Sequence, residues 1–148
     1  MRGFTLLELL VVLAIAGLLL ATIPPMVSAV MPGTELKTAT RELALSLRQA
    51  RLDAVSHATT VDVKFAGDPA RYAIGDSPFT LLPDDTQLRV RHLTYAEISL
   101  EPYRLNFFPD GSSSGATLLL SRRGSHHAVS VGWLMGRVTV NTDAIDVD

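Results

Sequence analysis

The side chains best suited to chemistry lie in the C-terminal third of the chain. Gly111-Ser112-Ser113-Ser114-Gly115 matches the G-x-S-x-G pattern of a nucleophile elbow, and His126 and His127 follow as candidate bases. An elbow needs a strand, a sharp turn and then a helix, whereas the segment Ala116–Ser121 is typical of a strand. The loop also lacks the Gly-Lys-Ser/Thr ending that cradles phosphate. The sequence therefore predicts no catalytic residue, no nucleotide site and no enzyme.

Two groups of side chains offer metal ligands. His126 and His127 are adjacent, and neighbouring residues of a strand point to opposite faces, so the pair is unsuited to a single ion. We expect both at a solvated hairpin end. Asp143, Asp146 and Asp148 offer oxygen ligands, but they lack the spacing and the glycine turn of an EF-hand, which favours a solvated tail. No metal and no cofactor is expected.

Composition limits the classes of partner. The chain has 148 residues, 47% of them hydrophobic and 19% charged, and 22 of the first 31 residues are hydrophobic. The remainder has the composition of a soluble domain. The absence of cysteine excludes disulfides, thiolate nucleophiles and Cys-ligated metals. The net charge of −2 does not favour nucleic acid.

The N-terminal segment is long enough to cross a membrane. Phe4–Ile23 has Glu8 as its only charge, and twenty residues of helix span about 30 Å. Arg2 places the N-terminal flank in the cytoplasm and the rest of the chain on the other side. The alternative is a secretory signal cleaved after Val27-Ser28-Ala29, although the apolar run exceeds the usual length and contains a carboxylate.

Glu8 has two interpretations. A carboxylate inside a membrane span is costly, so by default it indicates a function with a partner. Glu8 also lies only about one turn inside the segment, where its carboxylate can reach the headgroups without a partner.

A second helix is predicted after two interruptions. Pro24-Pro25 and Pro32-Gly33 predict a kink or local melting between about Ile23 and Thr34, with Thr34 as N-cap of an amphipathic helix over about 34–57. Its predicted core stripe is Leu36, Ala39, Leu43, Leu47, Ala50 and Ala54.

Leu45 and Leu52 lie on the opposite side of that helix, among polar residues. Either they contact neighbouring subunits, or they are isolated exposed leucines of the kind that most protein surfaces carry.

After His57 the pattern changes to short runs with period-2 alternation, separated by Gly, Pro and Asp. These runs predict two antiparallel sheets over 60–141 and, with the long helix, an α+β fold. The predicted strands are Thr60–Phe65, Arg71–Ile74, Gln87–His92, Glu97–Leu100, Tyr103–Phe108, Ala116–Ser121, Ala128–Trp133 and Arg137–Asn141.

The N-terminus carries a family resemblance. Gly3-Phe4-Thr5-Leu6-Leu7-Glu8-Leu9-Leu10, followed by an apolar run, resembles the processing and methylation motif of type IV pilins and type II secretion pseudopilins. The resemblance implies that a prepilin peptidase removes a leader of residues 1–3 after Gly3, and that Phe4 is N-methylated. It implies a helix over 4–31 that is stored in the bacterial inner membrane as a single pass and later forms the filament core. Glu8 then pairs with the Phe4 amino group of a neighbouring subunit.

The C-terminal half narrows the family. The segments 107–115 and 131–138, and the helix around Arg41–Arg51, resemble the H-type minor pseudopilin of type II secretion. The resemblance implies a pilin-like fold with a periplasmic domain over 32–148. It implies a structural subunit near the pseudopilus tip, which links the other minor pseudopilins to the major pseudopilin of the shaft and supports export of folded proteins across the outer membrane. Pro32-Gly33 departs from the family, whose helix is expected to continue there.

DNA uptake is the alternative function. Minor type IV pilins that resemble this family bind DNA through a C-terminal Gly-Arg-x-Arg signature. The chain has Gly136-Arg137-Val138-Thr139, with Thr in place of the second Arg, and Arg104, Arg122 and Arg123 are further basic candidates. One phosphate contact fewer and a net negative charge both disfavour DNA.

Overall fold

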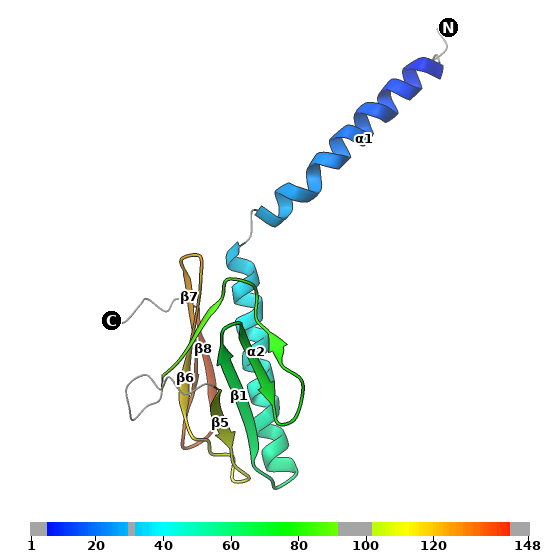
Figure 1. Ribbon diagram of the computed structural model, residues 1–148. Coiled ribbons are helices and arrows are strands. Elements are labelled where there is room, and N and C mark those ends of the chain that lie inside the picture. The colour runs from blue at the N-terminus through cyan, green and yellow to red at the C-terminus, as the bar shows by residue number, and fades with distance from the viewer. Residues whose placement is uncertain (1–5, 30–31, 92–101, 143–148) are drawn as a thin grey trace. The chain divides into compact units, whose positions relative to one another are not determined.

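The computed structural model describes residues 6–29, 32–91 and 102–142. The chain forms two compact units, residues 1–32 and residues 33–148. The first unit contains helix α1 (Leu6–Ala29) (Figure 1). The second unit contains the strands and helix α2 (Pro32–Ser56), whose first residue, Pro32, is counted with the first unit.

Helix α1 does not stop at the proline pair. It runs through Pro24 and Pro25 to Ala29, so the helix does not melt at the pair itself. Each proline removes one backbone hydrogen bond and its ring crowds the carbonyl four residues earlier, although its fixed φ lies within the helical range. α1 ends at Ala29 and α2 begins at Pro32, and both points lie within the predicted interval.

The exposed side chains of α1 are apolar around the helix apart from Glu8, from Leu6 to Leu18. Across the part of the chain that the structure describes, no helix has both the length and the hydropathy to cross a bilayer. The predicted span Phe4–Ile23 extends beyond the described side chains at both ends and stays a prediction.

Helix α2 begins at Pro32, so Thr34 is not its N-cap. Proline is favoured at the first helical position, where its missing N–H has no helical partner to lose. The predicted core stripe is confirmed, because all its members are buried: Leu36, Ala39, Leu43, Leu47, Ala50 and Ala54. Thr40 is also buried, and its hydroxyl donates to the Leu36 carbonyl at 2.7 Å.

The first sheet has the strand order β3-β2-β1-β5. Its strands are β1 (Val61–Gly67), β2 (Ala70–Ile74), β3 (Thr80–Leu81) and β5 (Tyr103–Phe107). β1 is central, with Val63 opposite Ile74 on one side and Leu105 on the other. β3 was not predicted, because two exposed residues cannot show alternation.

The second sheet has the order β4-β6-β7-β8. Its strands are β4 (Gln87–Arg91), β6 (Ala116–Arg122), β7 (Ser125–Val131) and β8 (Val138–Asn141). β7 begins and ends earlier than predicted. The β6–β7 turn is Arg123-Gly124, which leaves His127 inside the strand and 6% exposed, so its expected position at a solvated hairpin end was wrong. The predicted strand Glu97–Leu100 lies outside the described residues.

One core joins α2 to both sheets. It contains apolar side chains of α2, β1, β2 and β5 together with those of β6, β7 and β8. Its largest fully buried members are Phe65, Phe107, Leu43, Leu47 and Leu118. The α+β prediction, with a helix on two antiparallel sheets, is therefore confirmed (Figure 1).

Candidate assembly surface

The predicted N-terminal site is only partly described. Glu8 lies in the first turn of α1 and is exposed. Gly3 and Phe4 lie outside the described residues. Cleavage after Gly3, methylation of Phe4 and the pairing of Glu8 with a neighbouring Phe4 amine stay predictions.

Leu45 and Leu52 are exposed on α2, as predicted, at 61% and 57%. They belong to a stripe of exposed residues with spacings of 4, 3, 4 and 3, which also contains Arg41, Arg48 and Val55. Such spacing places all five on one side of a helix, away from the core stripe. This face is free to contact another subunit, and that contact stays a prediction.

The hydrogen bonds of the serine-rich loop 111–115 hold the loop in place. Ser113 is buried, its hydroxyl donates to the Gly132 carbonyl at 3.0 Å, and its backbone N–H donates to the Trp133 carbonyl at 2.8 Å. Strand β6 follows the loop where an elbow needs a helix. Ser113 therefore fastens the loop before β6 to the β7–β8 loop.

Both loops also meet α2 at Gly136. The Arg51 Nε–H donates to the Gly111 carbonyl at 3.0 Å. Gly136 has φ +55°, and a Cβ placed on it would lie 2.6 Å from the Gly111 oxygen and 2.9 Å from Arg51 Cδ and Nε. Only glycine fits such a close approach at this φ. The two C-terminal segments that carry the family resemblance therefore meet on the same part of α2.

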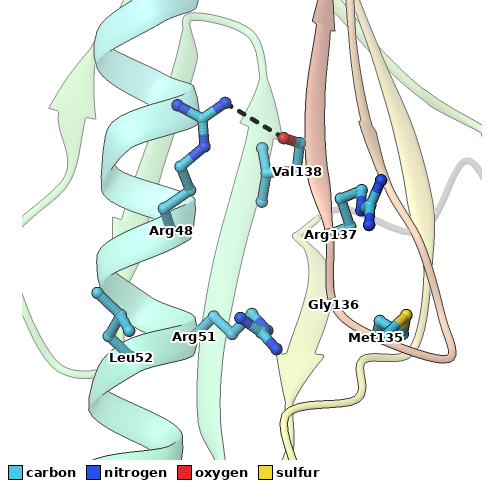
Figure 2. Close-up of a pocket in the computed structure, with 7 residues that line it drawn as sticks. All are labelled: Arg48, Arg51, Leu52, Met135, Gly136, Arg137 and Val138. Carbon is cyan, nitrogen blue, oxygen red and sulfur yellow. Dashed lines mark hydrogen bonds between the residues drawn. The ribbon is translucent and has the colours of Figure 1, made fainter.

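An open groove of about 430 Å³ lies beside this junction. Figure 2 shows Arg48, Arg51 and Leu52 on the α2 side and the β7–β8 loop across from them. Arg48 Nη2 donates to the Val138 carbonyl at 3.2 Å. The groove is lined by Arg48, Arg51, Leu52, Met135, Gly136, Arg137 and Val138.

The candidate DNA-binding arginines do not form one patch. Arg122 is buried against Glu35 at 2.7 Å, and Arg123 pairs with Asp85 at 3.0 Å. Arg104 lies 3.6 Å from Asp62. Carboxylates therefore neutralise three of the four predicted arginines.

Arg137 belongs to a different environment. It lines the groove with Arg48 and Arg51, and within the described ranges 6–29, 32–91 and 102–142 no carboxylate lies within ion-pair distance of these three guanidinium groups. The sequence did not predict that Arg48, Arg51 and Arg137 lie together. The 4-3-4-3 spacing of exposed residues on α2 was the available signal for its helical side.

Metal ligands do not gather in the described part of the chain, where no three His, Cys, Asp or Glu residues could hold an ion. His126 and His127 lie on opposite faces of β7, one half-exposed and one buried. Asp143, Asp146 and Asp148 lie outside the described residues.

Two family models match this chain, one in its globular domain and one at its N-terminus. The family model described as type II transport protein GspH matches residues 39–135, more than half of the chain. The chain belongs to the GspH family. A model of the prokaryotic N-terminal methylation motif matches residues 1–23. The resemblance to H-type minor pseudopilins is therefore confirmed, and family and motif together indicate a protein anchored in the inner membrane.

Relatives agree with the GspH assignment. The chain is 28% identical over 140 residues to the type II secretion system protein H of Xanthomonas campestris pv. campestris, covering 93% of this chain and 82% of the relative.

The pilin-like fold is confirmed by solved structures. The minor pseudopilin EpsH from the type II secretion system of Vibrio cholerae matches with a TM-score of 0.64 at 16% identity, over 77% of this chain and 98% of EpsH. The type IV minor pilin FimU of Pseudomonas aeruginosa matches with a TM-score of 0.57 at 18% identity, over 73% of this chain and 89% of FimU.

Proposed function

We propose that this GspH-family chain is a structural subunit near the tip of the type II secretion pseudopilus. It joins the other minor pseudopilins to the shaft of major pseudopilin and so supports export of folded proteins across the outer membrane. The observation that carries this proposal is that the chain combines two different parts. An apolar helix with one carboxylate precedes a domain whose second helix leaves Leu45 and Leu52 exposed.

The N-terminal motif supports a specific route to the filament. In this proposal a prepilin peptidase cuts after Gly3 and Phe4 is methylated, while α1 anchors the chain as a single pass with the globular domain in the periplasm. In the filament, Glu8 faces the Phe4 amine of the next subunit. Mass spectrometry of the mature chain should find N-methylated Phe4 at its start, whereas Gly3→Arg should leave the leader attached.

Isolation of the full chain from membranes tests the function itself. Extracted in mild detergent through a C-terminal affinity tag, it should carry the other minor pseudopilins and the major pseudopilin with it. Loss of the gene should leave the exported proteins folded in the periplasm, and the wild-type gene should restore export. Normal export without the gene would contradict the proposal.

DNA uptake remains the second candidate, and the ion pairs of Arg104, Arg122 and Arg123 weigh against it. A fluorescent duplex titrated with the full chain at physiological salt should bind no more tightly than about 10 μM, the range of non-specific contacts. Tighter binding that Arg137→Ala abolishes would favour the DNA-binding function.

A further inference from the structure

Charge is arranged unevenly over the globular domain. Arg122, Arg123 and Arg104 each lie close to a carboxylate of this chain. At the groove, Arg48 and Arg51 donate to backbone carbonyls, which leave the positive charges uncompensated. A guanidinium has five N–H donors, so each of the two keeps several for another ligand.

The two walls of the groove belong to different elements. Arg48, Arg51 and Leu52 come from α2, and Met135 and Arg137 come from the β7–β8 connection (Figure 2). The junction of Arg51, Gly111 and Gly136 fixes the walls against each other, because the Gly136 backbone lies directly on Gly111 and Arg51. The groove is therefore preorganised for a ligand.

Its rim is apolar to a degree unusual for a solvated loop. Trp133, Leu134 and Met135 are consecutive in the β7–β8 turn and are 61%, 66% and 62% exposed. On the helix, Leu52 also lines the groove and is exposed. Arginine, methionine and tryptophan are the residues enriched at protein interfaces.

We propose that this groove, lined by Arg48, Arg51, Leu52, Met135 and Arg137, docks an acidic and apolar segment of a neighbouring pseudopilin. One or more carboxylates of that segment enter among the arginines, and flanking apolar side chains cover Leu52 and the Trp133–Met135 turn. The inference rests on the proposed function and adds the chemistry of the partner. A nucleic acid fits less well, because surfaces that bind DNA are strongly basic and polar, whereas this rim is apolar and the chain has a net charge of −2.

The test is photocrosslinking of the full chain in the bacterium that assembles the machine. The photoreactive residue p-benzoylphenylalanine replaces Met135 in the groove and, as a control, Phe79, which is exposed at the β2–β3 connection. We expect an adduct from position 135 with another pseudopilin, and mass spectrometry should place it in a segment that combines Asp or Glu with apolar residues.

Charge reversal makes the test specific. Arg48→Glu with Arg137→Glu should reduce the adduct about tenfold or more, because repulsion replaces attraction. Lys37→Glu reverses one charge, as Arg137→Glu alone does, about 16 Å along the helix from Arg48, and it should leave the yield unchanged. A basic substitution of the identified partner carboxylate should restore crosslinking. Arg137→Glu alone provides the second variant, because the Arg137 side chain makes no hydrogen bond within the described ranges. Its replacement leaves the backbone hydrogen bond from Gly132 N–H to the Arg137 carbonyl in place, so folding should not change.

The remaining outcomes overturn the proposal. These are an adduct with DNA or with a second copy of this chain, an adduct that is insensitive to charge reversal, or none at position 135 while the chain still copurifies with pseudopilins. Failure of the chain to copurify with any pseudopilin would instead contradict the proposed function.

Discussion

Arg122 Nη1 lies 2.7 Å from Glu35 Oε2, which joins the end of β6 to the start of α2. The Arg122 side chain is 6% exposed and the Glu35 side chain 56%. Arg122 Nε also donates to the Asp84 carbonyl at 2.7 Å, in the turn before β4. One buried side chain therefore holds three separate parts of the fold together.

The two partners should respond unequally to removal. Arg122→Ala deletes buried packing and several charge-assisted hydrogen bonds, so we expect it to lower the free energy of unfolding by about 3 kcal/mol. Glu35→Ala should cost about 1 kcal/mol, because the guanidinium keeps its carbonyl partner and water can replace the half-exposed carboxylate. Chemical denaturation of both variants and the double variant measures the coupling. Equal losses would contradict this interpretation.

Gly136 should tolerate no side chain. Gly136→Ala forces a Cβ to within 2.6 Å of the Gly111 oxygen at φ +55°, and we expect a loss of about 3 kcal/mol or more in unfolding free energy. Gly75 is the matched control, with φ +56° and nothing within 4 Å of its ideal Cβ. Gly75→Ala should lower the unfolding free energy by only about 1 kcal/mol, the cost of a Cβ in the left-handed backbone region. Similar losses at the two positions would exclude the steric explanation.

Leu45 and Leu52 should matter for association and not for folding. Leu45→Ser with Leu52→Ser should leave the melting temperature of the full chain in detergent nearly unchanged and reduce copurification of other pseudopilins, because burial of two leucines contributes about 2–4 kcal/mol. Leu47→Ala is the core counterpart on the same helix and should cost about 2–5 kcal/mol of stability. Full retention of partners by the double variant would remove these leucines from the assembly surface.

Asp110 should make part of the stability depend on pH. Hydrogen bonds from the Ser112 hydroxyl at 2.6 Å and from its backbone N–H at 2.9 Å lower the pKa of Asp110 below its ordinary value of 3.8. The contribution is therefore complete above that ordinary value and is lost as the pH falls through the lower pKa of the folded state.

The pH effect is measured as a difference between variants. The melting temperature of Asp110→Ala should lie below that of the wild type at pH 6, and the gap should close as the solution is acidified below the ordinary pKa. If the difference in melting temperature between the wild type and Asp110→Ala grew on acidification, it would contradict the lowered pKa of Asp110.

Local patterns predicted most of the fold. The alternation in Val61–Phe65 and Val138–Asn141 and the spacing from Leu36 to Ala54 report which face is buried, so these two strands and the buried face of α2 were predicted correctly. The errors occurred where context outweighs the local signal. For example, β7 extends back past His127 because it pairs with the whole length of β6.

The groove could not be predicted in the same way. Arg48 and Arg137 are far apart in sequence. The contact of Gly136 with Gly111 and Arg51, together with the Arg48–Val138 hydrogen bond, brings their elements together. Similarly, Arg122 is one of several arginines in the sequence, and its burial against Glu35 depends on how β6 meets α2. Long-range pairings of this kind leave no periodic signal in a single sequence.

Glu8 provides the most direct measurement of whether the chain assembles as a pseudopilin. The comparison is between wild type, Glu8→Ala and Glu8→Asp as full chains in the producing bacterium, with membrane fractionation followed by crosslinking to the other pseudopilins. Glu8→Ala should remain fully in the membrane, because removing a carboxylate makes insertion easier, but should lose most of its crosslinks, and Glu8→Asp should retain part of them. Crosslinking of Glu8→Ala at the wild-type yield would contradict the pairing of Glu8 with Phe4 and the assembly route that depends on it.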